Sequence, residues 1–176
     1  LTTFGFTDCL QKVAEASGWR EKYGKLPRHR GIGIGCGSLI SGARVMGHSA
    51  STAQVKVQED GTVSLITGST DVGQGADTVL PMIAAEILGV RVEDVRFAMV
   101  DTDITPVDPG TFSSRVTFWT GNAVKLAAEE ARGELAKIAA RKLEVEPDDL
   151  DFRDRRVYVR HHPEQGLSFA ELVLLA

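Results

Sequence analysis

The chain has 176 residues, of which 43% are apolar, and a formal net charge of −4 at pH 7. A chain of this length buries roughly two-thirds of its unfolded surface, so we expect a globular core. The mixing of acidic and basic residues argues against a nucleic-acid surface, which needs a basic patch. Neither an apolar run of about 18 residues nor a leader pattern is present, so we expect a cytosolic chain that contacts no membrane.

Two regions are expected, an N-terminal helix with its connector (residues 1–30) and a larger domain (residues 31–176). The pattern FTDCLQKVAEASGW from Phe6 predicts a helix that Thr7 or Asp8 caps and Gly18 ends. A charged connector containing a proline follows it. In GIGIGCG (31–37) glycine alternates with Ile and Cys, which predicts a strand with one bare face that a backbone or a ligand can approach.

The next segments predict an α+β organisation. Residues 53–57 and 62–67 flank the turn Glu59-Asp60-Gly61, which indicates a β-hairpin. ADTVLPMIAAEILG (76–89) predicts a helix ended by its last glycine, with Pro81 kinking the helix or delaying its start. The following elements are a strand (95–100), a loop rich in Asp, Thr and Pro (101–110), a long helix (122–143), a strand (156–160) and a helix that Ser168 opens. The segments LGVRVEDV (88–95) and LEVEPDDL (143–150) echo each other, each bridging a helix and a strand. We therefore predict a mixed sheet with a β-hairpin and helices packed on it.

The glycine-rich segment GSTDVGQG (68–75) is the main candidate for a binding site. It lies between a predicted strand and a predicted helix, where free backbone N–H groups and the helix dipole favour an anion. The spacing is one residue short of a Walker A loop, and Gln74 stands where that motif needs its lysine, so nucleotide hydrolysis is disfavoured. What remains is a neutral phosphate cradle, in which the Gln74 amide is both donor and acceptor; the alternative is an ordinary glycine-rich turn.

A second polar cluster, GTFSSRVT (110–117), precedes the long helix and offers hydroxyl and cationic donors to phosphate oxygens or to a polar ring edge. Its alternative interpretation is a capped loop that leads into the helix.

Other candidate residues are weaker. GIGIGCG matches no dinucleotide-binding register. Cys9 and Cys36 lie in no metal-ligand spacing, so we expect them to be small buried residues. The histidines likewise show no ligand spacing. Asp71, Asp101 and Asp103 could form an acid/base or metal cluster, but loop aspartates more often cap turns, and we favour that role.

Together, GSTDVGQGADT, AAEILG, VDTDITP and GTFSSRVTFWTGNAV resemble, in order and spacing, the molybdenum-binding large subunits of the xanthine dehydrogenase family. The SSRVTF, GNA and DVGQG pieces, with GIGIGCGSLISGA upstream, are most similar to the α subunit of 4-hydroxybenzoyl-CoA reductase. The resemblance covers roughly residues 5–170. It departs from the family at two positions. The family often has glutamine at the position of Met82, and Pro81 is unusual in its helix.

The resemblance implies a cofactor-binding role. It implies that the chain binds the pyranopterin and phosphate of a molybdopterin cofactor, usually the cytosine dinucleotide form in bacterial members. It implies iron–sulfur clusters and FAD on partner subunits or domains, and a small aromatic or aromatic-CoA substrate; residues 38–50 would border its channel. The cofactor-binding residues that it implies are Gly73, Gln74, Gly75, Ala76, Asp77, Ser113 and Ser114.

The family's FRGFG-like segment and its glutamate base in a GE-containing motif are not found in this sequence. We therefore expect a fragment of a larger oxidoreductase subunit that needs the remainder of that subunit, contains no catalytic base or metal ligand of its own and is inactive alone. The alternative is a non-catalytic structural or binding module that retains the fold without cofactor.

Overall fold

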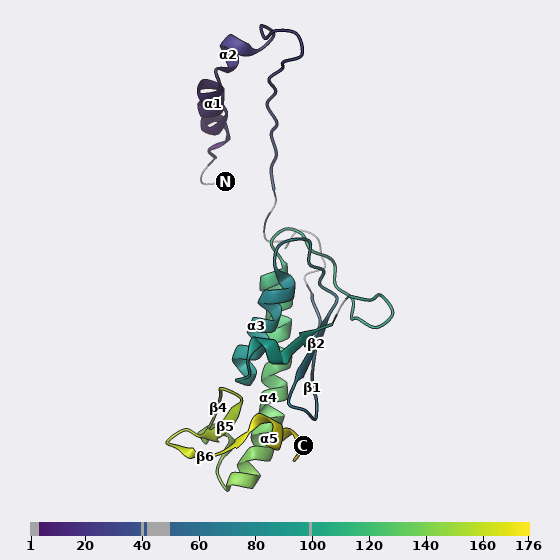
Figure 1. Ribbon diagram of the computed structural model, residues 1–176, viewed down its shortest axis with the longest axis vertical. Coiled ribbons are helices and arrows are strands. Elements are labelled where there is room, and N and C mark those ends of the chain that lie inside the picture. Colours follow the sequence, from purple (N-terminus) through teal and green to yellow (C-terminus); the bar gives the residue numbers. More distant parts are fainter. Residues whose placement is uncertain (1–3, 40, 42–49, 99) are drawn as a thin grey trace. The chain divides into compact units, whose positions relative to one another are not determined.

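The structure is a computed structural model that describes residues 4–39, 41, 50–98 and 100–176 (Figure 1). The chain forms two compact units, Leu1–Leu39 and Ile40–Ala176.

The first unit contains the predicted N-terminal helix. Helix α1 (Phe6–Ser17) ends at Gly18, whose φ of 63° lies in the left-handed region, as its role as a stop requires. Gly5 is the N-cap, so the prediction that Thr7 or Asp8 caps the helix is wrong: both lie inside the first turn. A short helix that was not predicted, α2 (Trp19–Lys22), follows directly.

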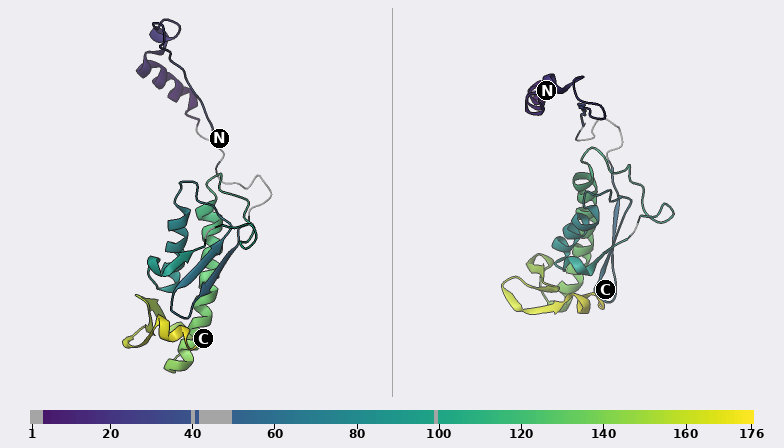
Figure 2. Two further views of the ribbon diagram at one scale, coloured as in Figure 1. Left: turned by 45° about the vertical axis from the view of Figure 1, so that its right-hand side comes forward. Right: turned by 45° about the horizontal axis from the view of Figure 1, so that its top comes forward.

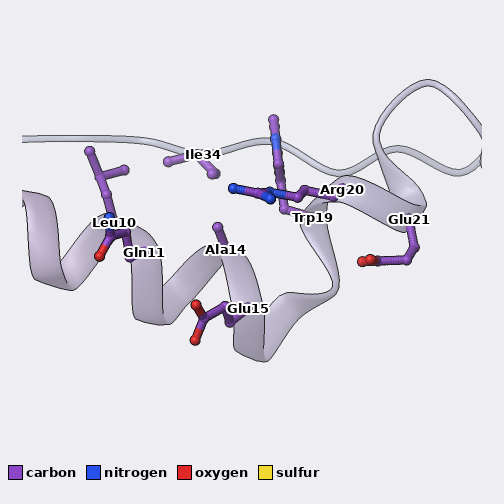
Figure 3. A pocket seen from close by; sticks show the side chains of 8 residues that line it. All are labelled: Leu10, Gln11, Ala14, Glu15, Trp19, Arg20, Glu21 and Ile34. Atoms are coloured by element: carbon purple, nitrogen blue, oxygen red, sulfur yellow. The ribbon is translucent and has the colours of Figure 1, made fainter.

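The first unit has no enclosed core among its described residues. A hollow of about 740 Å³ separates α1 from the extended segment that follows α2, and Figure 3 shows Leu10, Ala14 and Ile34 along it. No residue of α1 is buried. Cys9 and Cys36 are both exposed, so the expectation that they are buried is wrong. One short helix beside one extended segment provides no second layer to cover them.

The strand predicted for residues 31–37 is also not formed. These residues are extended, but they join no sheet. A Cβ placed on any of their four glycines has no neighbouring atom within 4 Å. The alternating pattern was present, but a strand also needs a hydrogen-bonded neighbour, and among the described residues this segment has none.

The second unit begins with the predicted hairpin. Strand β1 (Ala53–Val57) pairs with β2 (Val63–Thr67) in antiparallel register, from Ala53 opposite Thr67 to Val57 opposite Val63. After the glycine-rich turn comes α3 (Ala76–Leu88), and the chain returns as β3 (Val95–Phe97), which pairs with β2 in parallel. The mixed sheet that was predicted is confirmed, although β3 is shorter than the predicted strand 95–100.

Helix α3 contains Pro81 without interruption. The helix starts at Ala76, directly after its N-cap Gly75, and runs through Pro81 to Leu88. Proline removes the intrahelical hydrogen bond to the carbonyl of Asp77 in the first turn. Because the Pro81 side chain is buried against the core, apolar packing offsets that loss. The alternative that the helix begins late is therefore wrong.

The long predicted helix is α4 (Gly121–Leu143), and a π-helical turn, η3 (Val116–Thr120), leads into it. Helices α3 and α4 pack on each other and cover the same face of the β1-β2-β3 sheet, as the two views of Figure 2 show. Buried side chains from all three elements form the core: Val63 and Leu65 of β2, Leu80, Ala84 and Leu88 of α3, and Val124 and Ala128 of α4.

The two segments that echo each other in sequence have the same structure. Each helix ends in a left-handed residue, Gly89 after α3 (φ 67°) and Glu144 after α4 (φ 57°). Each is followed by a short 3-10 helix, η2 (Val92–Asp94) and η4 (Pro147–Asp149), that leads into a strand. The similar sequences of residues 88–95 and 143–150 therefore form the same helix-to-strand junction.

A second sheet lies beside the C-terminal half of α4 (Figure 1). The predicted strand 156–160 is its middle strand, while its two neighbours were not predicted. Ser168 caps α5 as predicted, through a reciprocal capping box with Glu171. The elements are β4 (Leu150–Arg153), β5 (Arg156–Val159), β6 (His162–Ser168) and α5 (Phe169–Val173), and the strand order is β4-β5-β6, antiparallel throughout. Within the described part of the chain, no helix combines the length and the apolar character needed to cross a membrane.

Candidate functional site

The carboxylate of Asp71 organises the glycine-rich turn between β2 and α3. One of its oxygens accepts the N–H of Gly73 (2.7 Å), and the other accepts the N–H of Asp77 in the first turn of α3 (3.1 Å). These backbone donors, Gly73 first, hold the pKa of Asp71 below its ordinary value. The turn-capping role favoured for Asp71 is confirmed.

Gln74 stabilises the same turn. Its Oε1 accepts the N–H of Val72 (2.7 Å), and its Nε2 donates to the carbonyl of Thr70 (3.1 Å). The side chain is therefore both donor and acceptor, as expected, but toward its own backbone. One Nε2 hydrogen and one Oε1 lone pair are left for another molecule. Gly73 and Gly75 have φ values of 103° and 83°, which other residues rarely adopt.

The loop 101–110 packs on the start of this turn. A Cβ on Gly68 would collide with the carbonyl oxygen of Pro106 and crowd Asp108, so only glycine permits this close approach. In addition, the hydroxyl of Thr111 donates to the carbonyl of Thr70 (2.6 Å). The turn is therefore fixed to the loop at Gly68 and, at Thr70, to the residue that follows the loop.

A buried ion pair anchors the same end of this loop. Nη1 of Arg115 lies 2.6 Å from Oδ1 of Asp108, and both side chains are completely buried. Arg115 also donates to the carbonyl of Gly110 (3.0 Å) and to the hydroxyl of Ser51 (2.8 Å). Ser51 in turn donates to Asp108 (2.7 Å), and Thr120 lies beside both.

This ion pair corrects one expectation. Arg115 was counted among the donors that the cluster 110–117 offers to phosphate, but its guanidinium points into the protein and contacts Asp108. Of the guanidinium nitrogens, Nε is buried and has no hydrogen-bond partner among the described residues. Asp108 and Ser51 were missed because no periodicity or motif marks residues 57 positions apart as neighbours.

The two candidate segments nevertheless face a common hollow. It has a volume of about 480 Å³ and is lined by Gln74 from the turn and by the seven residues 111–117 from the cluster. Ser113 and Ser114 have φ values of 50° and 56°, so two successive non-glycine residues adopt the left-handed conformation. Such strain costs free energy, and it is concentrated at functional sites. Sequence reasoning could not foresee this conformation, since serine has no preference for it.

The remaining predicted residues lie at the start of α3 and do not line this hollow. The side chain of Ala76 belongs to the core, and the N–H of Asp77 already donates to Asp71. Gly73 and Gly75 have no side chain and contribute only their backbone to the turn. The structure therefore brings together Gln74, Ser113 and Ser114 out of the seven predicted residues.

The alternative acid/base or metal cluster is not assembled. Asp101 caps its own turn by accepting the N–H of Asp103 (2.9 Å). Across residues 4–39, 41, 50–98 and 100–176, no group of three or more His, Cys, Asp or Glu side chains is placed to hold a metal ion. The predicted channel border, residues 38–50, falls largely on positions 40 and 42–49, outside the described residues.

Comparisons with known proteins identify the family of the chain. The family model of the molybdopterin cofactor-binding domain matches residues 10–176. The putative xanthine dehydrogenase molybdenum-binding subunit XdhA of Escherichia coli (strain K12) is 32% identical over 169 residues, which cover 93% of this chain and 22% of that protein. The carbon monoxide dehydrogenase large chain of Afipia carboxidovorans is 32% identical over 158 residues, which cover 86% of this chain and 20% of that protein.

A solved structure matches the fold as well. Quinoline 2-oxidoreductase from Pseudomonas putida 86 superposes with a TM-score of 0.67 and 32% identity, over 70% of this chain and 16% of that one. The chain thus spans about a fifth of the length of its relatives. The chain belongs to the family of molybdopterin cofactor-binding domains that form part of the large subunits of xanthine dehydrogenase-type and carbon monoxide dehydrogenase-type molybdenum hydroxylases.

Proposed function

We propose that the hollow between the glycine-rich turn and residues 111–117 holds part of a pyranopterin molybdenum cofactor. The observation that carries this proposal is the convergence of Gln74 with the strained Ser113-Ser114 pair on one hollow. Serine hydroxyls and backbone N–H groups are suitable donors for phosphate oxygens, and the spare donor and acceptor of Gln74 match a polar ring edge. The residues present therefore fit such a group.

The chain's own contribution is to bind and orient. The buried Arg115–Asp108 pair fixes one wall of the hollow, and the Asp71 and Gln74 contacts fix the other. When bound, the molybdenum cofactor supplies the oxidation–reduction chemistry, and the protein supplies position and electrostatics. We assign no catalytic base within this chain, and we expect the isolated chain to be inactive.

The finer assignments rest on the sequence motifs. We propose that the whole protein is a cytosolic molybdenum hydroxylase-type oxidoreductase acting on an aromatic or aromatic-CoA substrate, as in 4-hydroxybenzoyl-CoA reductase. We propose the cytosine dinucleotide form of the cofactor, and partner subunits that carry iron–sulfur clusters and FAD; relatives named as a large chain or as a complex subunit support the latter. Residues 1–30 would serve as a linker to the cofactor-binding part, 31–176.

Cofactor occupancy in the full-length subunit tests the proposal. We expect Ser114→Ala to lower the molybdenum and pterin content, since a hydrogen bond to a charged group contributes about 1.5–3 kcal/mol. Thr102→Ala is the matched control, because Thr102 is an exposed hydroxyl in the neighbouring loop, outside the hollow. Equal molybdenum content in both variants would argue against this hollow. Absence of molybdenum and pterin from the wild-type subunit would favour a non-catalytic module.

A further inference from the structure

The start of α3 is the place where a glycine-rich turn ordinarily binds an anion. A helix of 13 residues presents unpaired N–H groups and the positive end of its dipole in its first turn. The N-cap, Gly75, has no side chain that could satisfy these donors. In a phosphate-binding turn, the phosphate occupies this position.

Here the position is already filled by the protein itself. The two oxygens of Asp71 reach in opposite directions, one to Gly73 within the turn and the other to Asp77 within the helix. The N–H groups of Gly75 and Ala76 lie close enough to contribute to the lowered pKa of the carboxyl group. The carboxylate therefore has the donors and the charge environment that a bound phosphate would have.

A phosphate at the same place would meet two obstacles. It would have to replace Asp71 as acceptor for Gly73 and Asp77, and it would lie next to a carboxylate of the same sign. Gln74 does not relieve this, because its amide is bonded to Val72 and Thr70 on the turn itself. The turn carries no lysine or arginine, since residues 68–75 contain neither.

We propose that Asp71 is the resident anion of the glycine-rich turn, and that the start of α3 is closed to the phosphate groups of the cofactor. Asp71 is then a positioning residue: it fixes the turn so that Gln74 faces the hollow, and phosphate contacts fall to the opposite wall at Ser113 and Ser114. This inference rests on the proposed function for the cofactor, but the closure of the turn is a property of this chain alone.

Phosphate titration of the ¹⁵N-labelled chain, followed by NMR at constant ionic strength, tests the inference. Asp71→Asn removes the charge and the acceptor for Asp77, while its amide oxygen still accepts the N–H of Gly73 and preserves the turn. We expect the wild-type amide signals of Gly73, Gly75 and Ala76 to show no saturable shift with inorganic phosphate. In Asp71→Asn the same signals shift and saturate. The dissociation constant for phosphate is at least about tenfold lower than the lower limit that the wild-type titration sets.

Asp101→Asn is the matched control, because it removes an aspartate that caps a turn without a helix behind it. A residue that only stabilised the fold would not create affinity for phosphate when substituted. Saturable phosphate binding by the wild-type turn would overturn the inference, and so would failure of Asp71→Asn to gain binding. Neither result depends on molybdenum content, so the proposed function and this inference can fail separately.

Discussion

At the scale of single residues, the most consequential feature is the pair formed by Arg115 and Asp108. Two charges in the interior are tolerated only when each is paired and hydrogen-bonded. Here the hydroxyls of Ser51 and Thr120 and the carbonyls of Ala50 and Gly110 supply further hydrogen-bond partners. The pair holds residues 110–115 against the start of β1, and this anchoring positions the serine wall of the hollow.

Breaking this pair should destabilise the chain strongly. We expect Asp108→Ala to lower the free energy of unfolding by about 3–5 kcal/mol, because it leaves a buried guanidinium without its counter-charge. Urea denaturation measures the effect. The control is Glu134→Ala, which removes an exposed ion pair with Lys137 and should cost about 0–1 kcal/mol. Equal costs for the two variants would contradict the anchoring role of Asp108.

A second buried carboxylate should make stability depend on pH. Asp94 is 6% exposed, and its pKa is lowered by hydrogen bonds from Arg91 and by the nearby charge of Arg155. A depressed pKa in the folded state contributes stability above the unfolded pKa of about 3.9, and that stability is lost as the pH falls through the folded value.

We therefore expect the free energy of unfolding to decrease as the pH drops below about 4. Asp94→Asn should reduce this dependence of stability on pH. Chemical denaturation at a series of pH values measures it. Asp103→Asn is the control, since Asp103 is exposed and makes no ion pair among the described residues. The same pH dependence in Asp94→Asn as in wild type would exclude Asp94 as its source.

At the scale of elements, the two helix-to-strand junctions provide an internal comparison. Gly89 and Glu144 hold the same left-handed position after α3 and α4, and Val90 and Val145 make the same backbone hydrogen bond to the residue five positions earlier. Of these two residues, Gly89 is of the type that favours the left-handed conformation, and Glu144 is not.

We expect Glu144→Gly to raise the free energy of unfolding by about 1 kcal/mol, since it relieves a left-handed non-glycine residue. Gly89→Ala should lower it by more than about 1 kcal/mol, because a Cβ there would also collide with the backbone of Phe152. Thermal or urea unfolding measures both. Destabilisation by Glu144→Gly would contradict this account of the junction.

The elements that were predictable share a local cause. The hairpin, α3, α4 and the Ser168 cap depend on turn residues, capping residues and periodicity within a few positions. The two outer strands of the second sheet were not predictable in the same way: β6 contains the run His-Pro-Glu-Gln-Gly, and its pairing with β5 supplies what its sequence lacks. Residues 31–37 show the converse, a strand pattern without a partner among the described residues.

The candidate site was predictable in composition but not in geometry. The sequence predicts polar-ligand binding for the glycine-rich turn and the polar cluster, and the two segments face one hollow. The roles within them depend on contacts between residues distant in sequence. One set of contacts buries Arg115 with Asp108. A separate hydrogen bond directs the Asp71 carboxylate to the first turn of α3. Donors that composition counts as available are consumed when the chain folds.

At the scale of the whole molecule, the second unit is a small layered scaffold. Helices α3 and α4 cover one face of the sheet, and the hollow lies where β2 passes into α3 and the loop 101–110 passes into α4. The chain spans about a fifth of its relatives, so other parts of a large subunit would supply the remaining walls around a cofactor. This is why occupancy should be measured in the full-length subunit.

The most direct test of the central claim is an experimental structure of the full-length subunit with its cofactor bound. The account predicts cofactor density in the hollow lined by Gln74 and residues 111–117, with hydrogen bonds from Ser113 or Ser114 to phosphate oxygens and the Asp71 carboxylate still bonded to the N–H groups of Gly73 and Asp77. A cofactor bound elsewhere, with this hollow filled by solvent or by other protein segments, would contradict it.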